Sequence, residues 1–285
     1  MLDFSTKAMT LEDLTTKLRT ARIAPLYRFT VGAWRNDAEG ILRAVRAFAG
    51  GRELIVRSSC INEDATTHSN AGAYLTLMNV DDAQLPAAIG RVIDSYGTET
   101  AVDEVLIQPM LQQVVRSGVA FSHDPNTCAP YRIINWTDSE DTTSVTSGQG
   151  GRTWQMAAGA RVVAPAELVP VLALLDELLV LFSGRPLDCE FAVTQEVGAA
   201  VLWLLQVRPL VLTAVSETQE RLASRLAIIE EKVARGMRQH PFLMGKRTVY
   251  GVMPDWNPAE IIGVRPKPLS LSLYRDLVTD SIWAY

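Results

Sequence analysis

Apolar residues recur at helical spacing in four segments of the chain, with polar residues at the intervening positions. These segments are residues 11–21, 38–48, 85–96 and 168–182. In the first of them Leu11, Leu14 and Leu18 share one face, and Thr10 stands where a helix N-cap is expected. Residues 217–239 form another helical segment that is strongly charged, so we expect it to leave the core.

Short runs rich in β-branched, aromatic and leucine residues lie between these helices and end in polar or turn-forming residues. They occupy residues 23–30, 53–58, 74–80, 105–110, 118–121, 131–136, 187–194 and 199–207. The last two runs are separated by Glu196-Val197-Gly198, which is typical of a tight hairpin turn. Because strands and helices do not alternate strictly, the pattern predicts an α+β fold.

The bulk composition is that of a globular protein with a sizeable core. Of 285 residues, 48% are hydrophobic and 21% are charged, and this length suits one large domain or two ordinary ones. The net charge of −5 argues against a general nucleic-acid or anionic-membrane binder, because such proteins need a basic surface. We therefore expect no nucleic-acid partner and no membrane partner.

Neither the cysteines nor the apolar stretches indicate secretion or membrane insertion. Cys60, Cys128 and Cys189 are far apart and lack metal-ligand spacing, which favours buried thiols in a reducing compartment. The longest apolar stretch is interrupted by Asp176 and Glu177, so it reads as a buried helix and not as a membrane span. The sequence predicts a cytoplasmic protein.

Two cationic residues are candidates for holding phosphate. Arg57 follows an apolar strand and precedes two serines, so its planar guanidinium fork and their hydroxyls suit phosphate oxygens. Lys7 lies just before a helix and offers a compact, mobile charge. Each has an ordinary alternative, since an isolated arginine can cap a strand and an isolated lysine can be a solvated surface residue.

The predicted hairpin carries a second set of polar side chains. Gln206 and Arg208 are two residues apart and therefore share one face, and Glu190 of the preceding strand can lie on that face too. A carboxylate and an amide oxygen suit Mg²⁺, while a guanidinium suits the phosphate that the metal bridges. The alternative is an internal Glu–Arg ion pair on a strand that faces solvent.

Two glycine-containing loops are candidates for contacting a phosphate through backbone N–H groups. One is Asn70-Ala71-Gly72-Ala73, which follows a polar loop. The other is Ser147-Gly148-Gln149-Gly150-Gly151, whose glycine density suits either a mobile lid or a plain connector.

These motifs, in their order, resemble the N-terminal nucleotide-binding domain of phosphoenolpyruvate synthase and pyruvate phosphate dikinase, which has an ATP-grasp fold. I-V-R-S-S-C-I-N-E-D with the following A-G-A-Y-L-T-L-M-N-V is similar to the family's V-R-S-S-x-x-x-E-D and A-G-x-x-x-T-x-x-N-V. Q-P-M with S-G-V-A-F-S-H-D-P-N-T, D-C-E-F-A and L-Q-V-R-P also have counterparts. S-T-K-A-M-T-L resembles G-G-K-G-A-N-L. The resemblance spans roughly residues 3–212, and ordered motifs are harder to explain by chance than single ones.

The resemblance implies a role for each candidate. Lys7 and Arg57 would bind the triphosphate, and Arg208 would hold the transferred phosphate. Asn70, Ala71 and Gly72 would cover the triphosphate. Gln108 and Met110 would line the adenine pocket, and Glu190 and Gln206 would ligate Mg²⁺. The cofactors would be ATP and Mg²⁺. The residues so implied, in chain order, are Lys7, Arg57, Asn70, Ala71, Gly72, Gln108, Met110, Glu190, Gln206 and Arg208.

The implied architecture has two ATP-grasp subdomains, residues 1–98 and 99–215, with the nucleotide cleft between them. Residues 216–285 would be a helix and a Pro-rich linker toward a further domain. In the family the phosphoryl group passes to a histidine on a swivelling domain in a G-G-x-x-S-H context, and another domain binds the acceptor substrate. That motif does not occur in this sequence, so the phosphohistidine and acceptor domains would be partners.

Three functions follow from these features. The first is the nucleotide-binding part of a dikinase-type phosphotransferase. The second is an ATP-binding module without turnover, because the loop at Gly148 lacks the glutamate of the family's G-L-G-E-G and the G-G-x-x-S-H motif of the histidine domain does not occur in the sequence. The third is an ATP-grasp ligase that makes an acyl phosphate, which these motifs fit less well.

Overall fold

The computed structural model of the chain describes residues 2–60, 75–97, 100–138, 151–160, 162–214, 217–242, 244–247 and 258–280. The chain divides into two compact units. The first comprises Met1–His123, Tyr131–Met156 and Val162–Leu212, and the second comprises Asp124–Pro130, Ala157–Arg161 and Thr213–Tyr285. The first unit holds both sheets and every described candidate site residue.

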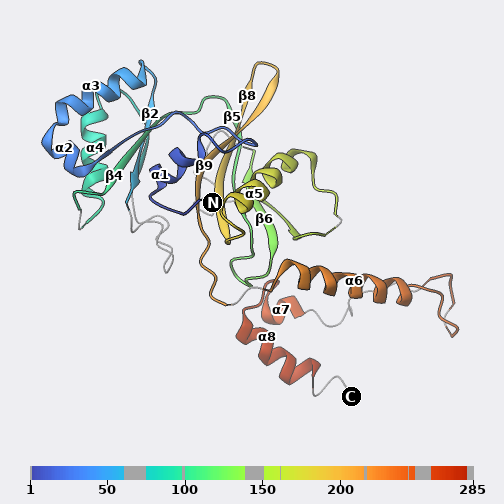
Figure 1. Cartoon of the computed structure of the whole chain (residues 1–285). Coiled ribbons are helices and arrows are strands. Elements are labelled where there is room, and N and C mark those ends of the chain that lie inside the picture. The colour runs from blue at the N-terminus through green and yellow to red at the C-terminus, as the bar shows by residue number, and fades with distance from the viewer. Residues whose placement is uncertain are drawn as a thin grey trace. The chain divides into compact units, whose positions relative to one another are not determined.

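One sheet of the first unit has four strands in the order β1-β4-β2-β3. They are β1 (Tyr27–Thr30), β4 (Glu104–Pro109), β2 (Leu54–Ser59) and β3 (Thr76–Val80), and each neighbouring pair is antiparallel. The helices α2 (Val31–Asn36), α3 (Ala38–Ala49) and α4 (Leu85–Asp94) lie beside this sheet (Figure 1).

Strand alternation divides the side chains of this sheet between the face covered by α3 and α4 and the opposite face. Val56, Val105 and Ile107 point into an apolar core with Val45 of α3 and Ile89 of α4. The alternate positions point the other way. This second set, which matters for the site, consists of Ile55, Arg57, Ser59, Glu104, Leu106 and Gln108, as the strand register requires.

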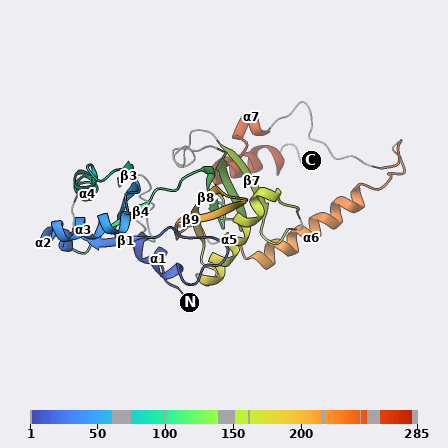
Figure 2. The ribbon, with the colours of Figure 1, turned by 90° about the horizontal axis from the view of Figure 1, so that it is seen from above.

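The second sheet has the order β7-β6-β5-β8-β9. Its strands are β7 (Arg152–Ala157), β6 (Tyr131–Thr137), β5 (Val114–Phe121), β8 (Leu187–Glu196) and β9 (Ala199–Pro209). A 3-10 turn η1 (Ala166–Leu168) leads into helix α5 (Val169–Leu181), which packs on one face of this sheet. Figure 2 shows the two sheets of this unit from above, with α3 and α4 beside one and α5 beside the other.

The core of the second sheet explains which residues remain for function. Phe191, Leu204 and Val207 are buried with Leu174 and Leu178 of α5. Residues one position away along β8 and β9 therefore point to the opposite face. As predicted, β8 and β9 form a hairpin, with Glu196 paired to Ala199 across the turn.

The first helix, α1 (Lys7–Leu14), begins earlier than the sequence predicts, so the expectation that Thr10 caps it is wrong. The N-cap is Thr6, whose hydroxyl accepts a hydrogen bond from the Met9 backbone nitrogen at 3.2 Å. Thr10 is buried within the helix, where it accepts a hydrogen bond from the backbone nitrogen of Ser5. Apolar spacing at Leu11 and Leu14 fixes the buried face of a helix but not its first residue.

Two elements of the first unit escape sequence prediction. Helix α2 is one and a half turns long, too short for a periodic pattern, and it starts because the Thr30 hydroxyl accepts from the Ala33 nitrogen. Strand β7 follows the glycine-rich segment, and its exposed first residues hide the alternation. The glycine-containing segment that ends at Gly151 is therefore followed directly by an edge strand.

The second unit contains α6 (Gln219–Gly236), α7 (Pro258–Ile262), α8 (Pro268–Tyr274) and one π turn, η2 (Arg275–Thr279). Thr218 caps α6, and Glu217 forms ion pairs with Arg221 and Arg225 in its first turns. Asp124 of this unit accepts hydrogen bonds from Asn126 and Thr127, so it has the turn role that Asp-Pro-Asn predicts. In the described part of the chain, no helix has the length and apolar character needed to cross a membrane.

The three cysteines are buried thiols, as the sequence predicts. Cys189 points into the core from β8, and burial raises the pKa of its thiol well above the ordinary value, with Asp188 and Glu190 adding to the effect. We therefore expect Cys189 to resist alkylation by iodoacetamide in the native chain and to react once the chain is unfolded in guanidinium chloride. Peptide mass spectrometry measures both, and labelling of native Cys189 at the rate of an exposed thiol would contradict this packing.

Candidate functional site

Arg57 joins the two sheets of the first unit. Arg57 lies near the end of β2, 7% of its surface is exposed, and its side chain reaches β9. The Nη1 group donates to the Leu205 carbonyl at 2.8 Å, and Nη2 donates to Gln206 Oε1 at 3.0 Å. Nη2 also lies 3.7 Å from Glu190 Oε2. Arg57 is therefore not a solvent-exposed strand cap but a buried cation at the junction of three strands.

The β8–β9 hairpin places its polar residues by register. Glu190 pairs with Gln206, and Asp188 pairs with Arg208, so all four side chains lie on the face opposite the α5 core. The register shifts between Glu190 and Phe191, which leaves Leu205 as an extra residue in β9. This bulge explains why the Leu205 carbonyl is free to accept from Arg57.

Arg208 has a partner, Asp188, that the sequence motifs do not indicate. Its Nε donates to Asp188 Oδ1 at 2.7 Å, and the Asp188 side chain is nearly fully buried. Two ion pairs involve this face of the hairpin: Asp188–Arg208 lies within it, and Glu190–Arg57 links it to β2. The signal for Asp188 was its position two residues before Glu190, which puts both carboxylates on one face.

Lys7 is buried, with 4% of its surface exposed, so it is not a solvated surface lysine. It is the first residue of α1. The backbone nitrogen of the next residue, Ala8, donates to Ser59 Oγ at 2.9 Å, and Ser59 is two residues beyond Arg57 on β2. The start of α1 and the end of β2 are thus in direct contact, which brings Lys7 into the neighbourhood of Arg57.

The resulting cluster contains three cationic side chains, Lys7, Arg57 and Arg208, and two carboxylates, Asp188 and Glu190. Among the described residues, the buried Nε of Arg57 has no hydrogen-bond partner. A buried donor without a partner is costly, and it points to an acceptor that a ligand would supply. The excess of positive charge makes an anion the suitable ligand.

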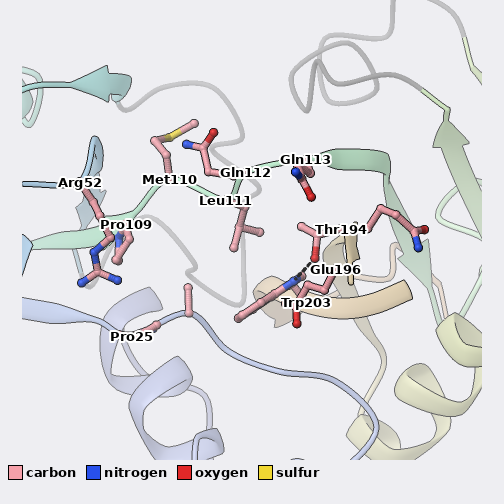
Figure 3. Close-up of a pocket in the computed structure, with 12 residues that line it drawn as sticks. Pro25, Arg52, Pro109, Met110, Leu111, Gln112, Gln113, Thr194, Glu196 and Trp203 are labelled. Atoms are coloured by element: carbon pink, nitrogen blue, oxygen red, sulfur yellow. Dashed lines mark hydrogen bonds between the residues drawn. The ribbon is translucent and has the colours of Figure 1, made fainter. Parts of the chain in front are cut away.

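The first unit also contains a cavity of about 280 Å³. One wall is the connection from β4 to β5, and the other is the tip of the β8–β9 hairpin (Figure 3). Figure 3 shows Leu111 projecting from the connection toward the Trp203 indole, and the Trp203 Nε1 donates to Thr194 Oγ1 at 2.8 Å. The lining residues are Ala24, Pro25, Arg52, Pro109, Met110, Leu111, Gln112, Gln113, Thr194, Gln195, Glu196 and Trp203.

The two residues predicted at the adenine site occupy different positions relative to this cavity. Met110 lines it directly, and its backbone nitrogen donates to the Glu53 carbonyl. Gln108 is buried behind the wall, where its Nε2 donates to the Ala24 carbonyl at 3.2 Å. Gln108 therefore contacts the cavity wall only through Ala24, which is one of the lining residues.

Three predicted residues, Asn70, Ala71 and Gly72, lie outside the described residues, as does the segment Ser147–Gly150. The described part of the site consists of the phosphate-side cluster and the cavity. Both are built on strands and on one helix start, so their side chains are held by packed elements.

The cationic cluster suits an anionic ligand, and comparison with known proteins shows which family the chain resembles. Residues 38–152 match the family model of the pyruvate phosphate dikinase AMP/ATP-binding domain. The match confirms the resemblance that the motifs carry. It includes Arg57, Gln108 and Met110, while Lys7 and the β8–β9 hairpin lie outside it.

The solved structures that are similar include ATP-grasp enzymes at low identity. D-alanine-D-alanine ligase from Helicobacter pylori is 14% identical, with a TM-score of 0.44 over 72% of this chain and 54% of that chain. D-alanyl-alanine synthetase A from Vibrio cholerae is 12% identical, with a TM-score of 0.42 over 77% and 60%. ATP citrate lyase from Methanothrix soehngenii is 16% identical, with a TM-score of 0.38 over 70% and 47%.

The chain spans about half the length of these structures. No curated protein matches its sequence significantly. The α+β prediction is confirmed by the two antiparallel sheets, which agree with the ATP-grasp architecture that the resemblance implies.

Proposed function

We propose that this chain binds Mg-ATP in the first unit and orients its triphosphate for phosphoryl transfer. The observation that carries the proposal is the meeting of Arg57 with Glu190 and Gln206, from strands of both sheets, beside a buried Arg57 Nε that lacks a partner among the described residues. The family match over residues 38–152 supports ATP as the ligand.

The cationic residues suit the triphosphate for different reasons. Arg57 presents a planar fork, which can hold two phosphate oxygens at once. Lys7 supplies a point charge from the start of α1. Arg208 is held by Asp188 at 2.7 Å, so its guanidinium is oriented before a ligand arrives. Positioning and charge neutralisation are the main requirements of phosphoryl transfer, and none of these roles needs a protein nucleophile.

Glu190 and Gln206 fit the requirements of Mg²⁺. Both offer oxygen atoms, the two residues pair directly across β8 and β9, and Mg²⁺ prefers oxygen ligands supplemented by phosphate and water. When bound, the metal would neutralise charge on the phosphates. Arg57 now contacts both residues, so we infer that the guanidinium turns to phosphate when Mg-ATP binds.

The adenine ring would occupy the cavity beside Met110. Its volume of about 280 Å³ and its mixture of Leu111, Trp203 and amide side chains suit a planar heterocycle with polar edges. Trp203 lies on β9 ahead of Gln206 and Arg208, and the bulge at Leu205 puts it on the same face as these two residues. Strand β9 therefore leads from the cavity to the cationic cluster.

In a dikinase-type cycle the phosphoryl group would pass to a histidine on a separate swivelling domain, and from there to an acceptor. We propose this as the fate of the bound ATP, with both domains as partners of this chain. The alternative is a module that binds Mg-ATP without transferring phosphate and changes the affinity of a partner. A phosphohistidine formed on an added partner domain supports the first, and stable binding without turnover supports the second.

Glu190→Gln tests the metal assignment. It keeps the size and one oxygen of the side chain but removes its charge, so we expect the gain in ATP affinity produced by Mg²⁺ to fall by about 10- to 100-fold. Isothermal titration with and without Mg²⁺ gives this gain as a ratio of dissociation constants. Glu167→Gln, an exposed glutamate of η1, is the matched control. An unchanged ratio in Glu190→Gln would remove Glu190 from the metal site.

A further inference from the structure

A buried carboxylate holds the first turn of α1. Glu104, at the start of β4, is 4% exposed. Its Oε2 accepts a hydrogen bond from Thr6 Oγ1 at 2.6 Å, and its Oε1 accepts from Arg28 Nη1 at 2.6 Å. Its backbone carbonyl accepts from the Tyr96 hydroxyl. The Glu104 side chain thus ties the residue before α1 and strand β1 to the face of the first sheet opposite α3 and α4.

Thr6 uses both hydrogen-bonding functions of its hydroxyl group. The oxygen accepts from the Met9 nitrogen as the N-cap of α1, while the proton is donated to Glu104. The Thr6 rotamer is therefore fixed at both ends. On the other side of Lys7, the Ala8 nitrogen donates to Ser59 Oγ. The residues on both sides of Lys7 are anchored, one to β4 and the other to β2.

The carboxylate is more than is needed to pack a helix against a sheet. Burying a charge is expensive, and an apolar residue of similar size often serves packing as well or better. Arg28 compensates the charge of Glu104, and its Nε also donates to Glu12 at 2.8 Å. The hydrogen bond to Glu12 and the charge of Glu104 both raise the pKa of Arg28. What the ionic arrangement supplies beyond packing is a single position for the Thr6 hydroxyl.

We propose that Glu104 is a positioning residue that acts through Thr6 to hold Lys7 at the triphosphate. This inference rests on the proposed function. The sequence has Ser5-Thr6 where the resembling motif has a glycine pair, so close backbone approach is replaced here by a lysine whose neighbours are anchored. Glu104 does not itself need to touch the nucleotide.

Glu104→Leu tests the link, because it keeps the volume but removes the acceptor for Thr6. We expect ATP to bind about 10-fold more weakly, a loss the size of one charge-assisted hydrogen bond. In the Lys7→Met background the same substitution is expected to change ATP affinity less than about 2-fold, because the residue being positioned is gone. Glu104→Gln, which keeps an acceptor oxygen, is expected to restore most of the affinity.

The same measurements separate positioning from a general loss of structure. An equal loss with and without Lys7, or no loss in Glu104→Leu, would overturn the inference. Thermal unfolding of each variant is measured alongside, and Thr6→Val with Thr6→Ser as its rescue repeats the cycle if Glu104→Leu does not fold. Failure of the wild-type chain to bind ATP would instead overturn the proposed function itself.

Discussion

Replacing Arg57 by methionine is expected to weaken ATP binding by on the order of 100-fold or more. Two charge-assisted hydrogen bonds to phosphate, at about 1.5–3 kcal/mol each, account for this loss. Methionine keeps the apolar stem, so the packing of the side chain against β9 is largely retained. Titration calorimetry with Mg-ATP measures the effect. Arg57→Lys is expected to recover only part of it, because an ammonium group cannot present a planar fork.

The same substitution should change metal binding in the opposite direction. Without nucleotide, Arg57 occupies Gln206 Oε1 at 3.0 Å and lies 3.7 Å from Glu190 Oε2. Removing this cation frees both oxygens, so Mn²⁺ alone should bind Arg57→Met more tightly than the wild type, as measured by electron paramagnetic resonance. Arg43→Met, an exposed arginine of α3, is the matched control. Weaker Mn²⁺ binding together with unchanged ATP binding would contradict the role of Arg57.

Replacing Gly118 by alanine is expected to have the largest effect on stability among substitutions outside the site. A Cβ atom at this position in β5 would lie 2.3 Å from the Asn135 carbonyl oxygen and 2.8 Å from the Phe191 ring. Neither neighbour can yield easily, because one is backbone of β6 and the other is a fully buried side chain. We expect a loss of about 3 kcal/mol in the free energy of unfolding.

Gly90→Ala is the matched control for this prediction. No heavy atom lies within 4 Å of the added Cβ at Gly90, which is inside helix α4. Alanine there should raise the free energy of unfolding by about 0.5–1 kcal/mol through helix propensity. Urea denaturation followed by circular dichroism measures both variants. Equal stability of the two would show that β5, β6 and Phe191 do not pack as described.

The hairpin shows how much of the site local sequence rules can predict. Alternation placed Glu190, Gln206 and Arg208 on one face, and the structure confirms that placement through the pairs Glu190–Gln206 and Asp188–Arg208. Alternation could not predict the bulge that frees the Leu205 carbonyl. The shift by one residue between Glu190 and Phe191 depends on packing on both sides of the sheet.

Contacts between segments that are distant in the sequence could not be predicted from local sequence patterns. Arg57 and Gln206 are 149 residues apart, and no periodic signal indicates that β2 and β9 meet. The position of Glu104–Pro109 between β1 and β2 is likewise set by the pairing of the whole sheet. The resemblance to a family predicted that these residues belong to one site. The residues taken singly indicated only what chemistry each could contribute.

The start of α1 illustrates the opposite failure, in which a local rule chose the wrong residue. Thr6 and Thr10 are both acceptable N-caps by residue type. The choice is made by tertiary contacts, because Glu104 fixes the hydroxyl of Thr6 and Ser59 accepts from Ala8. The position of Lys7 at the first turn of the helix, and its burial, follow from that choice.

The most direct measurement is isothermal titration of the wild-type chain with ATP in the presence of excess Mg²⁺. We predict saturable binding at one site, and weaker binding when Mg²⁺ is removed by a chelator. AMP should bind more weakly than ATP, because it lacks the phosphates that Lys7, Arg57 and Arg208 would hold. Absence of ATP binding at millimolar nucleotide, with the chain shown to be folded, would contradict a Mg-ATP site at Arg57, Glu190 and Gln206.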